Sequence, residues 1–380
     1  MTATLPGALP FPGAPAVGGA SRLPGITARG AGWAVLVLAV TLLPQQGSAS
    51  LLRDATLGAS YAVVGLSLNI LVGYAGQLSL GHQGFYCLGA LAAANVVDSG
   101  LNAGTPLQLF LGAVAAIGVC TVFALALGAI ALRITGLYLS LVTLVFGVAV
   151  TASLGSLDGL TNGGSGVHAN RPDSLTAGRY YVLCVAIVVA VFLLDRRVTA
   201  TKAGRAMLAL KENERAAQAF GVDVTRFKLL AFAMSGALAG LGGVLFVYST
   251  QLYSSNDFSQ INLALLFPVI VVVGGLGNRV GVAVAGFFFA MVTDLLGLLF
   301  DNVMTLKDVP LLKAYYDPQT HLALGNLIGA VLLLQTLIFN PGGLGASLRP
   351  AARWLSGGAF RGGHDDDGGI AAVEGSDVRA

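Results

Sequence analysis

The chain has 380 residues, of which 55% are hydrophobic and 10% charged, whereas soluble domains usually carry about 25% charged residues. This composition argues against a water-soluble enzyme. The formal net charge is only +3, and most basic residues lie in short stretches between apolar runs, where membrane topology explains them better than nucleic-acid binding does. The three cysteines lie inside apolar runs without metal-ligand spacing, so they indicate no metal site.

In chain order, residues 1–30 come first and are rich in Pro, Gly and Ala, which predicts a disordered cytoplasmic extension. Ten apolar segments follow, at residues 31–43, 55–72, 80–97, 107–132, 137–154, 179–194, 229–248, 261–273, 280–300 and 322–339. Most of them approach the ~20 residues that a membrane-spanning helix needs. The sequence therefore predicts an all-α integral membrane protein with about ten transmembrane helices in residues 31–345, followed by a disordered cytoplasmic tail at 346–380.

Two of the ten segments are unusual. The first is only about as long as a signal-peptide core, and Ser48-Ala49-Ser50 after it resembles a cleavage site. We interpret it as an uncleaved helix, and cleavage would leave nine helices with unchanged orientations. The eighth segment is short and contains Pro268, which a membrane helix tolerates as a kink when neighbouring groups satisfy the freed carbonyl.

Basic residues predict the orientation, because Lys and Arg next to the spans favour the cytoplasmic side. With both termini inside, the outer loops hold five basic residues and the inner segments sixteen. The outer five are Arg53, Arg171, Arg179, Lys307 and Lys313. The opposite orientation would reverse this bias, so we expect cytoplasmic N- and C-termini.

The longest charged loop runs from residue 195 to 228 and contains a predicted helix at 203–220. Small and apolar residues recur along one face of that helix, and charged residues surround them. The apolar positions are Ala206, Leu210, Ala217 and Phe220, and Gly221 is expected to end the helix. Two interpretations stay open: a helix that lies on the lipid headgroups, and a docking helix that fits a groove on a cytosolic motor and transmits its movement.

This loop and the start of the next helix are similar to a known family. They read GRAMLALKENERAAQAFGV at 204–222, KLLAF at 228–232 and SGALAGLGG at 235–243. Together these stretches resemble the cytoplasmic loop of bacterial branched-chain amino acid ABC transporter permeases. Four further stretches are similar to that family in the same order, namely GYAGQLSLGH at 73–82, RITGLYLSLVTLVFG at 133–147, LTNGGSGV at 160–167 and NPGGL at 340–344. The resemblance covers about residues 61–344 and is nearest to the LivM-type subunit.

The resemblance implies a multi-pass permease of the bacterial inner membrane that translocates branched-chain amino acids. It also implies partners: cytosolic ATP-binding subunits, a second homologous permease and an extracytoplasmic substrate-binding protein. The residues that match the family's ATPase-coupling loop are Gly204, Arg205, Lys211, Glu212, Asn213, Glu214, Arg215 and Gly221. In this chain no lysine follows a glycine, so a GxxxxGK phosphate loop is absent. ATP is therefore expected to be used by partner subunits, and the chain itself is expected to need no cofactor.

Both the substrate and the class of transporter have alternative interpretations. Many relatives carry a carboxylate after the fifth-helix pattern, where this chain has Gly147-Val148-Ala149, so the substrate class is left open. Urea and short amides, which relatives of this family carry, are the alternative substrates that the resemblance implies. An ion-coupled secondary transporter would need acidic residues within its helices, and Asp294 is almost the only one. A membrane-embedded enzyme would need clustered catalytic groups, but three of the four histidines, His168, His321 and His364, are expected in loops or the tail. We therefore assign no catalytic or metal-binding residue.

Candidate residues for the translocation pathway come from the glycine-rich stretch at 73–89 and from the ninth segment. They are Gln77, Ser79, His82, Gln83 and Asp294. Polar groups and glycines at membrane depth need protein or water partners, so an interrupted helix that faces a central cavity is one reading. Tight packing with these groups bonded across helices is the other. For His82 alone, we favour a neutral imidazole bonded to a neighbouring helix.

A second glycine-rich stretch, GGLGNRVG at 274–281, repeats the arrangement at 73–81: an apolar span, a cytoplasmic turn and a returning helix. Two interpretations are compatible with this repetition. One is a pair of related halves with a site between them. The other, which we favour, is a tight turn that uses glycine for positive φ.

Overall fold

The computed structural model describes residues 49–100, 105–131, 134, 136–155, 157–161, 166–258, 261–302 and 331, which belong to one compact unit. The elements in order are α2 (Ala49–Leu68), the π-helix η1 (Asn69–Tyr74), α3 (His82–Asp98), α4 (Pro106–Ala131), α5 (Leu137–Gly155), α6 (Asp158–Thr161), β1 (Val167–His168), α7 (Ala177–Ala200), α8 (Lys202–Glu212), α9 (Glu214–Ala219), α10 (Val224–Thr250), β2 (Leu252–Tyr253), the 3₁₀ helix η2 (Ser255–Asp257), α11 (Ile261–Gly274) and α12 (Arg279–Asn302). The predicted extension at 1–30, the first apolar segment and the tail at 346–380 lie outside the described residues, as does the tenth segment apart from Val331.

The second to ninth predicted segments are all helices, as the apolar runs indicated. Five helical stretches among the described residues are long and apolar enough to span a membrane: Ala49–Tyr74, Pro106–Ile130, Leu137–Leu154, Ala177–Ala200 and Val224–Thr250. Leu263–Gly274 and Arg279–Val292 are shorter apolar helices. This pattern is that of a multi-pass membrane protein.

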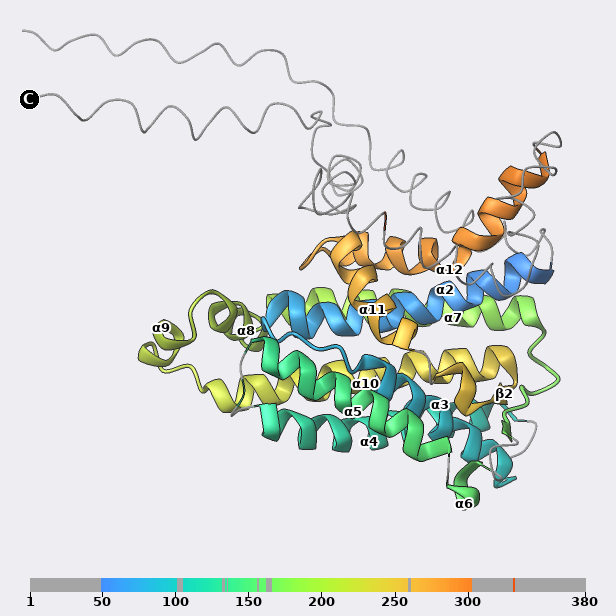
Figure 1. Cartoon of the computed structure of the whole chain (residues 1–380), viewed down its shortest axis with the longest axis horizontal. Helices are drawn as coiled ribbons and strands as arrows, with labels where there is room; N and C mark the ends of the chain where they lie inside the picture. Colours follow the sequence, from blue (N-terminus) through green and yellow to red (C-terminus); the bar gives the residue numbers. More distant parts are fainter. Residues whose placement is uncertain are drawn as a thin grey trace, which may run out of the picture. The chain divides into compact units, whose positions relative to one another are not determined.

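The helices run back and forth between two ends of the bundle (Figure 1). Helices α8 and α9 lie at one end, and α6 and β2 lie at the other. At the end that holds α6 and β2, the strands β1 and β2 form a short antiparallel pair, in which Val167 lies opposite Tyr253 and His168 lies opposite Leu252. At the α8–α9 end, η1, in which the glycine-rich stretch at 73–81 begins, meets the 195–228 loop and the α11–α12 turn, because Lys211 donates to the carbonyl of Gly73 and Gly277 donates to Asn69. The predicted shared side of these three loops is confirmed.

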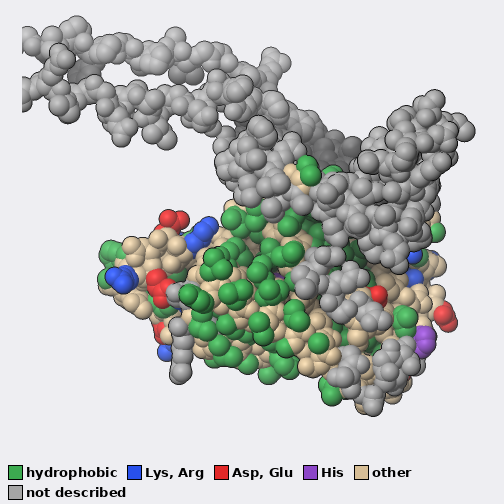
Figure 2. All heavy atoms as spheres, viewed as in Figure 1, with side chains coloured by type: hydrophobic (Ala, Val, Ile, Leu, Met, Phe, Trp, Pro, Cys, Tyr) green, Lys and Arg blue, Asp and Glu red, His purple; other side chains and the backbone are tan. Residues whose placement is uncertain are grey.

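The helices α2, α3 and α10 form the interior of the bundle. α10 packs against both α2 and α3, and other helices pack around these three. In the apolar part of the 49–74 span, 83% of the residues are buried, whereas in the apolar part of α4 only 22% are buried. Large apolar side chains are accordingly exposed along α4, α5 and α7. Figure 2 shows hydrophobic side chains between the two ends and charged ones at both ends, one of them around α8 and α9. This is the distribution expected when the middle of a bundle faces lipid or another membrane subunit.

Glycines allow α3 and α10 to approach closely. A Cβ at Gly89 would collide with the backbone of Gly240, and one at Gly243 would collide with the carbonyl oxygen of Tyr86. The same contact is bridged by hydroxyls, since Ser60 of α2 donates to the Gly242 carbonyl over 2.9 Å and lies 3.0 Å from the Tyr86 hydroxyl. Small residues and buried hydroxyls therefore hold the three inner helices together, as is common in membrane bundles.

Candidate functional site

The predicted helix at 203–220 is two helices, which corrects the single helix expected from the sequence. Asn213 interrupts it with an extended backbone, φ −157° and ψ 107°. Its side-chain oxygen accepts a hydrogen bond from Ala216 N at 3.0 Å, so Asn213 ends α8 and caps the start of α9. An Asn competes with helical winding by this kind of local bond. Gly221 follows α9 with φ +83° and ends it as predicted.

The apolar stripe of this loop is only partly buried. Leu210 and Ala217 pack with Val224 in a small cluster of their own, and Met207 is fully buried. Phe220 does not join them, because its side chain is 88% exposed. The sequence placed Phe220 on the same stripe as Leu210 and Ala217, but the helix breaks at Asn213 and α9 ends before Phe220. Aromatic residues are enriched where proteins contact one another, so Phe220 is a candidate for a contact with a partner.

Two lysines attach the loop to the bundle. Lys211 Nζ donates to the carbonyl of Gly73 over 2.9 Å, and Lys228 Nζ, on α10, lies 2.8 Å from Glu214 Oε2. Beside Lys211 lies a cleft of about 260 Å³. It is lined by residues of the turn after η1, of the α4–α5 turn and of α8 and α9, including Gln77, Gly136, Glu212 and Asn213. The cleft belongs to the same end of the bundle as the predicted coupling residues.

Five of the eight predicted coupling residues fall into two groups. Gly204 and Glu214 serve packing, since a Cβ at Gly204 would collide with the Val198 carbonyl and Glu214 holds Lys228. Arg205, Glu212 and Arg215 are exposed, but Arg205 also donates to the Ala200 carbonyl over 3.0 Å. Substitutions of Glu212 and Arg215 therefore test docking most directly, whereas substitutions of Gly204 and Glu214 also disturb the fold.

The Lys228–Glu214 pair gives a test of the loop's own stability. The Lys228 side chain is 4% exposed and that of Glu214 is 41% exposed. We expect Glu214→Ala to destabilise the purified permease by about 1–3 kcal/mol, because it leaves a buried ammonium without its partner. Lys228→Met is expected to cost less, since the remaining carboxylate reaches water. Thermal unfolding in detergent measures both, with Glu212→Ala as the exposed control, and equal melting temperatures for all three variants would contradict the prediction.

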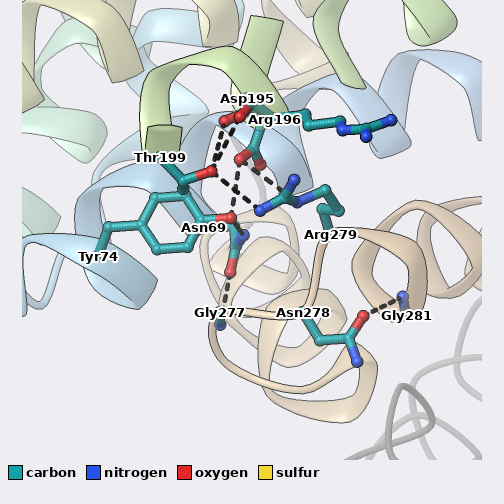
Figure 3. A network of polar contacts seen from close by, with 9 residues as sticks. All are labelled: Asn69, Tyr74, Asp195, Arg196, Thr199, Gly277, Asn278, Arg279 and Gly281. Carbon is teal, nitrogen blue, oxygen red and sulfur yellow. Dashed lines mark hydrogen bonds and ion pairs between the residues drawn. The ribbon is translucent and has the colours of Figure 1, made fainter. Parts of the chain in front are cut away.

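A polar network lies at the same end of the bundle (Figure 3). Its centre is Asp195 on α7, which is fully buried. The Tyr74 hydroxyl donates to Asp195 Oδ1 over 2.7 Å, and Arg279 Nε lies 3.8 Å from the same oxygen. Asp195 Oδ2 has no hydrogen-bond partner among the described residues. A buried carboxylate is costly unless charged and polar groups surround it, so these contacts account for an aspartate in an apolar helix.

The network extends to the two turns that flank it. Asn69 of η1 donates to the Tyr74 hydroxyl over 3.1 Å and accepts from Gly277 N over 2.8 Å. Arg279 also donates to the Thr199 hydroxyl over 3.1 Å. Three elements therefore meet here: η1, the end of α7 and the α11–α12 turn, in which Gly275 and Gly277 have the positive φ expected of a tight turn.

The sequence did not single out this network. Asp195 stood at the start of the hydrophilic loop and Arg279 counted only as a topology signal. The one available indication was that the two glycine-rich stretches resemble each other. The structure brings them into contact, because a Cβ at Gly73 would lie 2.9 Å from Gly277 N. Pairing between residues so far apart leaves no periodic pattern to detect.

The stretch at 73–89 is interrupted as expected, because η1 ends at Tyr74 and α3 begins at His82. Its polar groups are bonded within the protein. His82 Nε2 lies 2.7 Å from Ser235 Oγ, and Ser79 Oγ lies 3.1 Å from His82 Nδ1. Ser235 in turn donates to the Ser67 carbonyl, so the hydroxyl accepts from His82 Nε2–H. This is the helix-bonded imidazole that we favoured.

The remaining pathway candidates are dispersed. Gln77 lines the cleft beside Lys211. Gln83 is buried against Gly147, and its Oε1 has no partner among the described residues. Asp294 belongs to α12, but its side chain lies outside the described residues. A transport role for these residues therefore stays a prediction.

Comparisons with known proteins agree with this architecture. The family model described as branched-chain amino acid transport system / permease component matches residues 50–336. The chain is 30% identical over 357 residues to the high-affinity branched-chain amino acid transport system permease protein LivM of Salmonella typhimurium, covering 85% of this chain and 76% of that protein. It is 31% identical over 294 residues to the LivM of Escherichia coli, covering 69% and 67%.

A more distant relative is the probable LivM of Methanocaldococcus jannaschii, 26% identical over 321 residues, with 75% of this chain and 90% of that protein covered. No solved structure matches the chain. The family match includes every described helix from α3 to α12 and nearly all of α2. The chain belongs to the family of permease components of branched-chain amino acid transport systems.

Proposed function

We propose that the chain is a membrane-spanning subunit of an ABC importer that carries branched-chain amino acids across the bacterial inner membrane. The observation that carries this proposal is the family match along residues 50–336. In this proposal ATP is bound and hydrolysed by separate cytosolic subunits, and the chain itself binds no cofactor. A second homologous permease completes the membrane domain, and an extracytoplasmic binding protein delivers the substrate.

The proposal places the α8–α9 end in the cytoplasm, with about ten spans and both termini inside. Its support is the charge distribution, since the 195–228 loop and the α11–α12 turn hold many of the basic residues of the described region. Helices α8 and α9 then contact the ATPases. Phe220, Arg215 and Glu212 are all exposed on this loop, and this mixture of aromatic and charged side chains fits a protein surface better than a lipid one.

The buried Asp195 bears on the ion-coupled alternative. A secondary transporter needs a carboxylate that exchanges a proton or cation. Asp195 is instead bonded to Tyr74 and faces Arg279, which offsets its charge within the protein. The geometry therefore favours a structural aspartate and an external energy source.

The test is reconstitution of the permease with its co-purified ATPases in proteoliposomes, with the binding protein and labelled leucine outside. We expect uptake that requires ATP inside the vesicles and persists with a protonophore. Uptake by the permease alone, or loss of uptake with the protonophore while ATP is present, would contradict the proposal. Competition by unlabelled isoleucine and valine, but not by urea or acetamide, is expected; the reverse would assign the amide substrates.

A further inference from the structure

The π-helix η1 is unusual in its length as well as its position. It covers six residues, Asn69–Tyr74, directly after α2, and Ala75 N donates to Ile70 O over 3.2 Å in the wide π pattern. Such turns are rare and occur frequently at functional sites. Here the π-helix lies at the point where the 49–74 span gives way to the irregular segment before α3.

The polar network depends on this winding. Asn69 and Tyr74 are five residues apart and are joined directly, Nδ2 to the hydroxyl oxygen, over 3.1 Å. In an α-helix, residues five apart point in directions about 140° apart, whereas π winding places them on the same face. If the segment rewound as an α-helix, Asn69 and Tyr74 would therefore separate. Tyr74 would then leave Asp195, or Asn69 would leave Gly277.

The same turn is attached to the coupling loop. Lys211 of α8 donates to the carbonyl of Gly73, inside η1, and the Lys211 Cγ lies 3.1 Å from where a Cβ on Gly76 would be. Movement of α8 therefore acts on the π turn without an intermediary. On its other side, η1 is bonded to the connection between α11 and α12. Asn69 accepts from Gly277 N, and Tyr74 donates to Asp195, which faces Arg279.

We propose that η1 is a latch: in its π form it ties the α11–α12 turn to α7, and displacement of α8 by the ATPases rewinds it and releases that turn. Tyr74 and Asn69 act as positioning residues, and the released helices are α11 and α12. This inference rests on the proposed function, because the force on α8 comes from the ATP-binding subunits.

The decisive variant is Tyr74→Phe, which removes the hydroxyl shared by Asn69 and Asp195 and keeps the ring. The matched control is Tyr180→Phe on the same helix as Asp195, which removes a buried hydroxyl bonded to the Leu245 carbonyl over 2.9 Å. Both are assembled into the complete complex in proteoliposomes. The readouts are ATPase rates with and without the leucine-loaded binding protein, and leucine uptake.

A latch that opens too easily lets the ATPases cycle without substrate. We expect Tyr74→Phe to raise the basal ATPase rate about 5- to 10-fold, because the hydroxyl's bonds to Asp195 and Asn69 are lost, and to lower uptake per ATP hydrolysed. Tyr180→Phe is expected to leave both unchanged. Asn69→Ala combined with Tyr74→Phe should raise the rate by less than the product of the two single effects, because the bond between the two side chains is lost in both single variants. Equal basal rates for Tyr74→Phe and Tyr180→Phe overturn the latch.

A measurement on the unmodified complex keeps the inference testable if a variant assembles poorly. Hydrogen exchange of the amides of the α11–α12 turn at 275–281, which include the Gly277 N–H bonded to Asn69, is compared between the resting complex and the complex trapped with ATP. Faster exchange after trapping supports release of the turn, and unchanged protection overturns it. If the wild-type complex transports leucine with ATP but either test fails, the latch falls and the proposed function stands. If the wild-type complex neither hydrolyses ATP nor transports, both fall.

Discussion

Replacing Gly243 with valine is expected to remove most of the folded permease. The reason is the crossing of α3 and α10, where a Cβ at Gly243 would collide with the carbonyl oxygen of Tyr86 and approach Ala90 N within 2.8 Å. Both obstacles are backbone atoms, so no side-chain rotation relieves them. Overpacking of a tight core costs about 1–3 kcal/mol, and more where backbones must separate, which is a large share of a typical stability.

The measurement is the amount of monodisperse protein extracted from membranes, together with its melting temperature in detergent. Gly118→Val on α4 is the control, since a Cβ there meets nothing within 4 Å and the two changes are chemically identical. We expect the control to be recovered at wild-type yield. Equal yields and melting temperatures for the two variants would show that α3 and α10 are not packed as described.

Replacing Phe220 with aspartate is expected to reduce ATP-driven leucine uptake at least tenfold while leaving the permease stable. The side chain is 88% exposed at the end of α9, so its loss costs the isolated permease little. An exposed aromatic residue that enters a partner's pocket contributes about 2 kcal/mol or more to binding, and a buried carboxylate in its place would be more costly still. Co-purification of the ATPases with the permease should fall in parallel.

The control for Phe220→Asp is Leu125→Ala on α4, at an exposed apolar residue far along the chain from the loop. Alanine is used there because an aspartate at Leu125 would damage a spanning helix. It is expected to keep both uptake and ATPase co-purification. Glu212→Arg and Arg215→Glu test the same surface by charge reversal and are expected to weaken co-purification, more so at low ionic strength. Unimpaired coupling in Phe220→Asp and in both charge variants would exclude α8 and α9 as the docking surface.

The choice of these probes differs from what sequence alone recommends. The sequence pointed to Gly204, Glu212 and Glu214 as equivalent coupling positions. In the structure Gly204 packs against the end of α7 and Glu214 binds Lys228, so changes there confuse folding with docking. Only the fold separates the exposed members of a motif from the packed ones, because both kinds share one short charged stretch.

The apolar runs by themselves determined the helical class, the approximate limits of α2–α5, α7 and α10–α12, and the common side of the basic loops. They do so because spanning lengths and charge placement are local properties that the membrane imposes on each segment. The break at Asn213, the winding of η1 and the burial of Asp195 came only from the tertiary structure. Each depends on partners distant in the chain or on a competition between local bonds, as when Tyr74 meets Asp195 across 121 positions. The composition of a single segment does not indicate such a pairing.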